Sequence, residues 1–213
     1  MLCYTFSMKL FLASMAKDPV SVVELKKFVG GFDGKCIAYI PTAGNGEGLG
    51  SWKDGGSWAL VQTLNANIKL IELEDYTQKD VMDDLIGSDI IWFAGGSAGY
   101  LAYWTTRTGL NKSLRSLLDN GTIYVGSSAG SMVASTSLKV AEWYIGETEI
   151  GAGNIPGLGL VDFEIYPHYD EKYLDEIKEK YQGKKLYLLK DGEEIIVEDN
   201  LVRVVGGKRI ISK

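Results

Sequence analysis

A serine stands between two glycines where a short apolar run ends. Residues 122–125 are β-branched or aromatic, and Gly126, Ser128 and Gly130 then match the G-x-S-x-G pattern of a nucleophile elbow. In such an elbow, a sharp turn between a buried strand and a helix presents the serine at the strand tip. A side chain at either glycine would collide with the neighbouring strand or helix. The spacing therefore makes Ser128, rather than Ser127, the candidate nucleophile.

A histidine is the second group that this chemistry needs. Serine attacks a carbonyl near neutral pH when a base accepts its proton, and histidine is the usual base. The chain has one histidine, His168. A lone histidine near a strand end is more often a packed or solvated residue, and residues 126–130 alone would also suit an ordinary strand-to-helix turn. Together they indicate a serine hydrolase that loses activity on acidification, because a protonated imidazole accepts no proton.

Two further glycine-rich segments could complete the site. The run from residue 88 reads as a strand that ends in Gly95 and Gly96. The N–H of Gly96 could approach an oxyanion with no side chain in the way, and the N–H of Ala129 would be the second donor. Structural glycines at a tight turn are a compatible alternative. The loop 41–57 reads as a rim or lid with Trp52 as an apolar contact, or equally as a disordered surface loop.

Alternating apolar strands and helices must position these residues. We expect strands at 8–14, 35–40, 68–73, from 88 and from 122, and helices at 19–29, 58–66, 77–86, about 109–119 and 171–181. Short β runs at 185–189, 194–197 and 201–205 predict a C-terminal β-hairpin region. The pattern predicts one α/β domain over residues 1–213, with three layers doubly wound around a mostly parallel sheet. Residues 1–7 read as an N-terminal extension ahead of Met8.

The composition restricts the partners. A net charge of −6 and a pI of about 4.9 argue against nucleic acid or an anionic membrane as the main partner. No apolar run reaches the roughly 20 residues that span a bilayer, so we expect a cytoplasmic protein. Cys3 and Cys36 lack metal-ligand spacing, and with one histidine we expect neither a metal site nor a cofactor. Three aromatic residues could serve the core, a pocket or a homodimer interface: Trp92, Tyr103 and Trp104.

In the order Ala94 to Gly96, Gly126 to Gly130 and Tyr166 to His168, the chain resembles the peptidase E (aspartyl dipeptidase) and cyanophycinase family of serine peptidases. The resemblance implies a fold related to class I glutamine amidotransferases and a small peptide substrate. It also implies Ser128 as nucleophile, His168 as base, and the N–H groups of Gly96 and Ala129 as oxyanion donors. For the third triad member it favours Glu142, with Asp191 as the alternative suggested by cyanophycinase-like relatives.

Two departures from the family pattern concern the substrate. The family usually has Gly-Gly-Asn-Thr where this chain reads Gly95 to Ala98, and the arginine that suits an aspartyl substrate is missing from the acidic segment 169–177. A strict preference for aspartate is therefore not expected, although Lys172 could partly replace the arginine. Alternatives to a serine-type peptidase are a degenerate relative that binds peptides or metabolites without turnover, and an esterase, although the His-Gly-Gly-Gly loop of esterases is absent.

Overall fold

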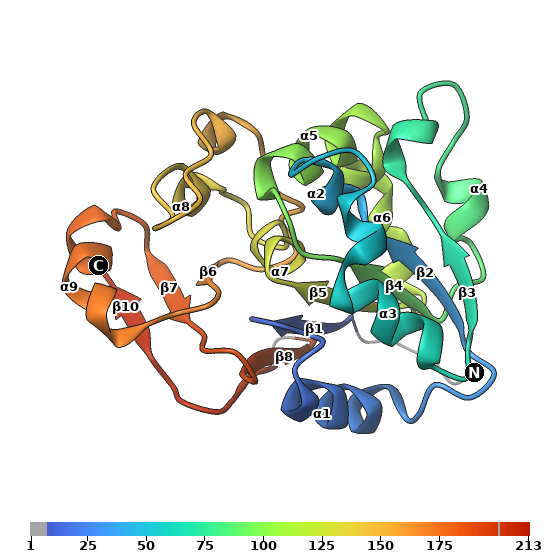
Figure 1. Cartoon of the computed structure of the whole chain (residues 1–213), viewed down its shortest axis with the longest axis horizontal. Helices are drawn as coiled ribbons and strands as arrows, with labels where there is room; N and C mark the ends of the chain where they lie inside the picture. The colour runs from blue at the N-terminus through green and yellow to red at the C-terminus, as the bar shows by residue number, and fades with distance from the viewer. Residues whose placement is uncertain (1–7, 200) are drawn as a thin grey trace, which may run out of the picture.

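A central seven-stranded sheet organises the computed structural model, which describes residues 8–199 and 201–213 (Figure 1). The expected extension at 1–7, with Cys3, lies outside the described residues. The strands are β1 (Lys9–Ala13), β2 (Cys36–Ile40), β3 (Asn67–Leu70), β4 (Ile90–Phe93), β5 (Ile123–Ser127), β8 (Glu194–Glu198) and β9 (Leu201–Val205), in the order β3-β2-β4-β5-β1-β8-β9. β3, β2, β4, β5 and β1 run parallel, whereas β8 is antiparallel to β1 and β9 to β8. The expected mostly parallel sheet is confirmed.

Helices cover both faces of this sheet because its strands are apolar on both sides. In β1, Leu10 and Leu12 belong to one buried cluster, together with residues of α5 (Ala98–Arg107) and α6 (Leu110–Asp119). Phe11 and Ala13 point the other way and pack with α1 (Pro19–Val29) and α3 (Gly56–Thr63). Figure 1 shows α1 and α3 below the sheet and α5 and α6 above it. The result is the expected three-layer arrangement.

Local signals explain where individual helices begin and end. Asp18 caps α1 by accepting a hydrogen bond from the N–H of Val20, and Gly30 ends the helix in the left-handed conformation. The helix expected at 77–86 is much shorter, because α4 spans only Met82–Leu85. The carboxylate of Asp80 accepts a hydrogen bond from the N–H of Met82 and so caps the chain at that point. The helix α5 was not among the expected elements.

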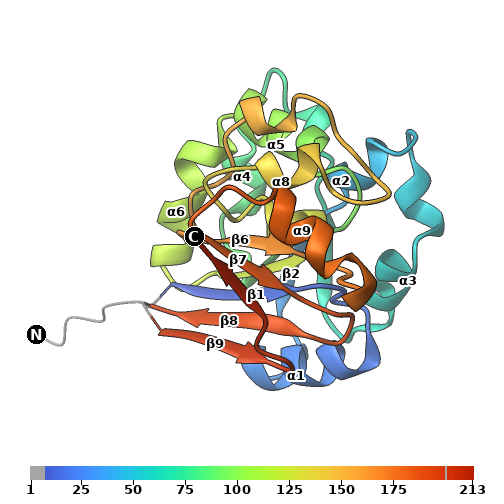
Figure 2. The same cartoon turned by 90° about the vertical axis from the view of Figure 1, so that its left-hand side faces the viewer.

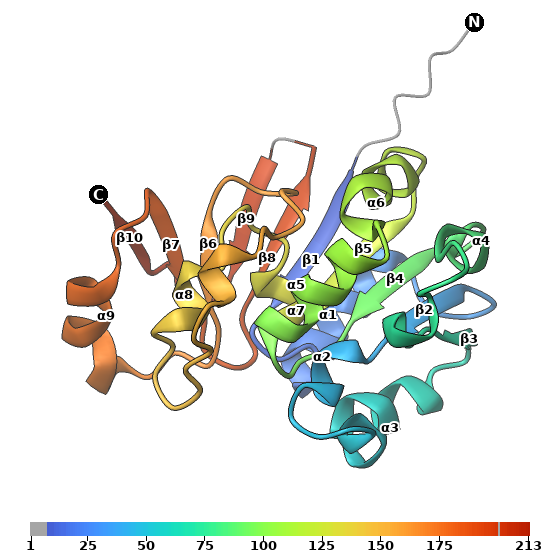
Figure 3. The same ribbon diagram turned by 90° about the horizontal axis from the view of Figure 1, so that it is seen from above.

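The C-terminal β runs include the expected hairpin but are divided between two sheets. β8 and β9 form an antiparallel hairpin that extends the central sheet beside β1, as Figure 2 shows. β8 belongs there because Ile195 and Ile196 fill the two opposite cores. β7 (Lys185–Leu188) instead joins β6 (Glu164–Tyr166) and β10 (Ile210–Ser212) in a three-stranded sheet. Figure 3 shows this small sheet and α9 (Leu174–Lys180) at the end of the molecule remote from β3.

The remaining elements are short and lie mostly near the carboxyl ends of the strands. They are α2 (Thr42–Asn45), α7 (Ala129–Met132), α8 (Lys139–Glu142) and the 3₁₀ helices at Ser51–Asp54, Leu73–Asp75, Ala152–Asn154 and Glu171–Tyr173. Because β1, β2, β4 and β5 are parallel, the segments that follow them meet at one edge of the sheet. No helix in the described part of the chain is long and apolar enough to cross a membrane.

Candidate active site

Ser128 occupies a strained turn between β5 and α7. Its backbone has φ 50° and ψ −111°, a region that residues with a side chain rarely adopt. The two flanking glycines are required by contacts. A Cβ at Gly126 would lie 2.6 Å from the carbonyl oxygen of Gly130, and a Cβ at Gly130 would lie 2.3 Å from that of Phe93. The elbow geometry expected from the sequence is therefore confirmed.

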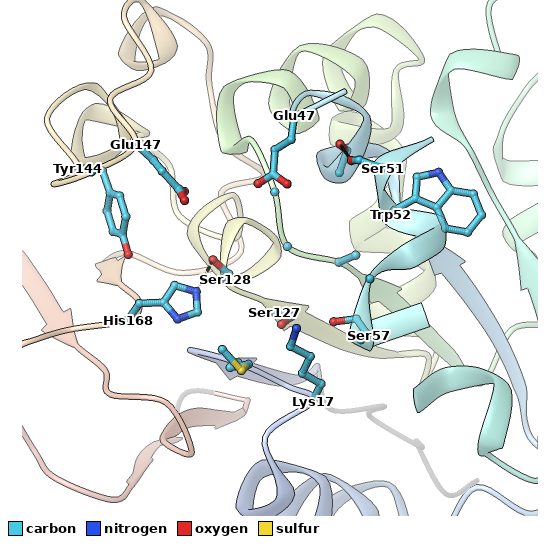
Figure 4. A pocket seen from close by; sticks show the side chains of 18 of the residues that line it. Lys17, Glu47, Ser51, Trp52, Ser57, Ser127, Ser128, Tyr144, Glu147 and His168 are labelled. Atoms are coloured by element: carbon cyan, nitrogen blue, oxygen red, sulfur yellow. Dashed lines mark hydrogen bonds between the residues drawn. The ribbon is translucent and has the colours of Figure 1, made fainter. Parts of the chain in front are cut away.

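His168 lies beside the serine although it comes from the small sheet. Its Nε2 is 3.0 Å from Oγ of Ser128, and its Nδ1 is 2.6 Å from Oδ1 of Asp191. His168 follows β6 and Asp191 follows β7. These two strands are adjacent and parallel, so the carboxyl ends of both strands meet at one edge of the small sheet. Figure 4 shows the imidazole ring pointing toward Ser128. The three side chains form a continuous Ser-His-Asp chain of hydrogen bonds, with the geometry of a general base held by a carboxylate.

The expectation that Glu142 contacts the imidazole is wrong. Glu142 ends α8, and its carboxyl group packs against Gly153, where an added Cβ would lie 2.9 Å from Cδ of Glu142. Asp191, the alternative, is the acid that contacts His168. The physical reason is the parallel pairing of β6 with β7, which brings the segment after β7 to the histidine.

Ser14 is a further member of this network that the sequence reasoning missed. This fully buried residue follows β1 directly, and its hydroxyl donates to Oδ1 of Asp191 at 2.9 Å. Oγ of Ser14 also accepts a hydrogen bond from the backbone N–H of His168 at 2.7 Å. His168 itself has φ 50°, so this contact holds a strained backbone. The available signal was its place at the end of the first predicted strand, at the edge where Ser128 and Gly96 also lie.

The segment after β4 passes close to the serine, as expected for an oxyanion loop. Gly96 has φ 131°, and a Cβ there would lie 2.3 Å from the carbonyl oxygen of Ala43, so a side chain is excluded. A Cβ at Gly95 would lie 3.3 Å from that of Ser128. Among the described residues, the N–H groups of Gly96 and Ala129 donate to no protein acceptor, which leaves both able to bind an anion.

Glu149 holds the start of α5 behind this loop. Its carboxylate accepts hydrogen bonds from the N–H groups of Ala98 and Gly99 at 2.8 and 2.7 Å and from the hydroxyl of Ser97 at 2.6 Å. A carboxylate at a helix N-terminus is stabilised by the helix dipole and the free N–H groups. Ser97 stands where the family pattern has asparagine, and here it binds this glutamate. Glu149 was not among the residues expected at the site.

An open cavity of about 500 Å³ adjoins Ser128 and His168. Much of the glycine-rich segment 41–57 forms its wall, which agrees with a rim and not with a disordered loop. Trp52 is almost fully buried, with its ring edge-to-face against Trp58 at 5.3 Å between centroids. Three charged residues also line the cavity and were not predicted: Lys17, Glu47 and Glu147. Burial and the nearby carboxylates of Glu147 and Glu149 raise the pKa of Glu47.

Lys172, the expected replacement for the missing arginine, lies elsewhere. Its Nζ forms an ion pair with Asp170 at 2.7 Å, and the residue is not among those that line the cavity. Of the aromatic residues left open, Trp92 is fully buried in the core beneath the sheet, and Trp104 packs partly buried against the other core. Tyr103 is half exposed on α5.

Comparisons with known proteins find matches over nearly the whole chain. The sequence profile of peptidase family S51 matches residues 11–205. An uncharacterized peptidase of Listeria monocytogenes is 28% identical over 96% of this chain and 97% of its own length. A peptidase E of Nostoc sp. is 27% identical over 88% of this chain and 78% of its own length. In structure, the chain resembles a proposed peptidase E protein from Listeria monocytogenes, with a TM-score of 0.75 and 25% identity over 93% of this chain and 98% of that one.

Proposed function

Because the chain belongs to peptidase family S51 and is thus a peptidase, we propose that it is of the serine type and hydrolyses short peptides or related amides through an acyl-enzyme on Ser128. The observation that carries this proposal is the hydrogen-bonded chain from Ser128 through His168 to Asp191, with distances of 3.0 and 2.6 Å. The cavity beside it gives a substrate direct access to the serine.

The first half of the reaction forms the acyl-enzyme. Oγ of Ser128 attacks the scissile carbonyl carbon while its proton passes to Nε2 of His168. The carbonyl oxygen becomes negatively charged and binds the N–H groups of Gly96 and Ala129. The C–N bond then breaks, and the leaving amine takes the proton from Nε2. Asp191 accepts the Nδ1–H bond throughout and stabilises the imidazolium.

The second half returns the enzyme to its starting state. A water molecule attacks the acyl carbon while His168 accepts one of its protons, and the same proton then passes to Oγ of Ser128 as the acid product leaves. The rings of Tyr144 and Tyr166 pack in a tilted arrangement at 4.6 Å between centroids, and the hydroxyl of Tyr144 donates to the carbonyl oxygen of Pro167 at 2.8 Å. This packing fixes the segment that carries the histidine.

The test is a panel of dipeptides and aminoacyl amides, varied at the first residue, incubated with the wild type and with Ser128→Ala while released amine is measured. We expect turnover in the wild type and its loss in the variant. The matched control is Ser127→Ala, because Ser127 adjoins the nucleophile but its hydroxyl accepts a hydrogen bond from the N–H of Ala16. Turnover that persists in Ser128→Ala would refute the mechanism.

A serine-directed phosphonate probe separates the peptidase from a relative that only binds peptides. An activated Ser128 reacts covalently with the probe, and mass spectrometry locates the label on the peptide that contains it. Denatured protein is the control, because it keeps the hydroxyl but not the His168 contact. A folded wild type that stays unlabelled and inactive would instead support the binding relative.

A further inference from the structure

The charges of the cavity are arranged asymmetrically around the proposed nucleophile. Figure 4 shows Lys17 on one side of Ser128, with Glu47 and Glu147 on the other. We propose that Lys17 determines specificity by binding a carboxylate of the substrate. This inference rests on the proposed function, because it assumes that the cavity beside Ser128 receives the substrate.

Lys17 is free to bind an anion. It belongs to the connection between β1 and α1, and it lines the cavity that Ser128 and His168 also line. Its ammonium has no carboxylate within 4.0 Å among the residues that the structure describes. By contrast, Lys172 and Lys190 are paired with Asp170 and Glu171 at 2.7 and 3.2 Å. A cation without a partner inside a substrate cavity favours a negatively charged ligand group.

The surroundings of Lys17 offer further donors to an anion. Its Nζ lies beside Gly56, where an added Cβ would be only 3.2 Å away, so the missing side chain makes room for the ammonium. Gly56 begins α3, whose cap residue Gly55 provides no side-chain hydrogen bond. The hydroxyl of Ser57 points toward the cavity in Figure 4. The partial positive charge of this helix end acts in the same direction as the ammonium.

The opposite wall excludes a carboxylate. Glu47 and Glu147 both line it, and among the described residues neither forms an ion pair. Their proximity contributes to the raised pKa of Glu47. A substrate carboxylate on that side would meet two like charges, so a substrate that carries one is oriented with this group toward Lys17.

The carboxylate has two chemically equivalent sources in a short peptide. One is the C-terminal carboxylate of a dipeptide, which departs with the leaving amine. The other is the side chain of an acidic first residue, which stays on the acyl-enzyme. Both present the same group to Lys17, and the experiment distinguishes them.

The experiment measures binding by calorimetry in Ser128→Ala, so that it needs no turnover. One ligand pair is alanyl-alanine and its C-terminal amide, and the other is aspartyl-alanine amide and asparaginyl-alanine amide. We expect the carboxylate member of at least one pair to bind on the order of tenfold more tightly, as a charged hydrogen bond would give. Adding Lys17→Met should remove this preference, and adding Lys17→Arg should retain it. The pair that responds identifies the source.

The control is Lys172→Met in the same background, because it changes the net charge equally but removes a lysine outside the cavity. The double variant should prefer the carboxylate member of each ligand pair as strongly as Ser128→Ala alone does. Equal binding of both members of both pairs, or a preference that survives Lys17→Met, would overturn the inference. Hydrolysis by the wild type is measured separately, so a failure of the Lys17 assignment is distinguishable from a failure of the serine mechanism.

Discussion

The hydroxyl of Ser14 donates to Oδ1 of Asp191 at 2.9 Å, and that same carboxylate oxygen is 2.6 Å from Nδ1 of His168. Ser14 also accepts a hydrogen bond from the backbone N–H of His168, so one buried hydroxyl fixes both the proposed base and its acid partner. It connects the end of β1 in the central sheet to the segments that follow β6 and β7 in the small sheet. The geometry of the site therefore depends on how the two sheets pack together.

Replacing Ser14 with alanine should lower kcat and leave KM nearly unchanged, because the hydroxyl orients His168 and Asp191 and touches no substrate. The loss of hydrogen bonds of this kind corresponds to a decrease of about tenfold or more. Steady-state kinetics on the best substrate of the panel measures both constants. A rise in KM at constant kcat would instead assign Ser14 to substrate binding.

Asp191→Asn and Glu142→Gln should differ sharply in activity. An asparagine at 191 cannot accept the Nδ1–H bond in the same way or stabilise the imidazolium, and in a serine protease triad the corresponding loss is about 10⁴-fold in kcat. Glu142 packs against Gly153 and should tolerate glutamine with a change within about twofold. Kinetics of the two variants side by side decides between the acids. A large loss in Glu142→Gln with an active Asp191→Asn would reverse the assignment.

Gly130→Ala should destabilise the fold by about 1 to 3 kcal/mol, because the added methyl group meets the backbone of β4. The ideal Cβ lies 2.3 Å from the carbonyl oxygen of Phe93, which cannot move without distorting the sheet. Gly56→Ala is the comparison, since the atoms nearest to a Cβ there belong to the flexible end of the Lys17 side chain and not to backbone. Urea unfolding gives the free energy of each variant. Equal stability of Gly130→Ala and the wild type would contradict the crowded elbow.

The Glu194→Gln variant should become more stable relative to the wild type as the pH rises. Glu194 is fully buried beside Ser21, and burial raises its pKa from 4.5 to about 7. Because the folded state holds the proton more tightly, the stability that the neutral group contributes is present below pH 4.5. It is lost as the pH rises to about 7.

Glutamine has no such titration, so the unfolding free energy of the variant should gain about 3 kcal/mol relative to the wild type between pH 4 and 8. Urea unfolding of both proteins at several pH values checks this, and the shared titrations of other groups cancel in the difference. A difference that does not change with pH would show that Glu194 is ionised in the folded protein.

Local chemistry explains what could be read from the sequence. Gly126, Ser128 and Gly130 define the elbow within five consecutive residues, and the crowding that requires glycine at position 126 comes from Gly130 in the same turn. The alternation of apolar strands with helices likewise predicts the mostly parallel sheet, because each strand and each helix has its own local pattern. Each signal lies inside one segment and needs no knowledge of distant contacts.

Only the tertiary structure decided which other residues meet Ser128. Long stretches of sequence separate Ser128 from Asp191 on one side and from Ser14 and Lys17 on the other. No spacing rule links these residues. Asp191 reaches His168 because β6 and β7 pair in parallel in the small sheet, a pairing that the sequence pattern did not indicate. Ser14 and Lys17 join the site because β1 lies next to β5. The nucleophile is thus determined by its own turn, whereas its partners are determined by the order of the strands.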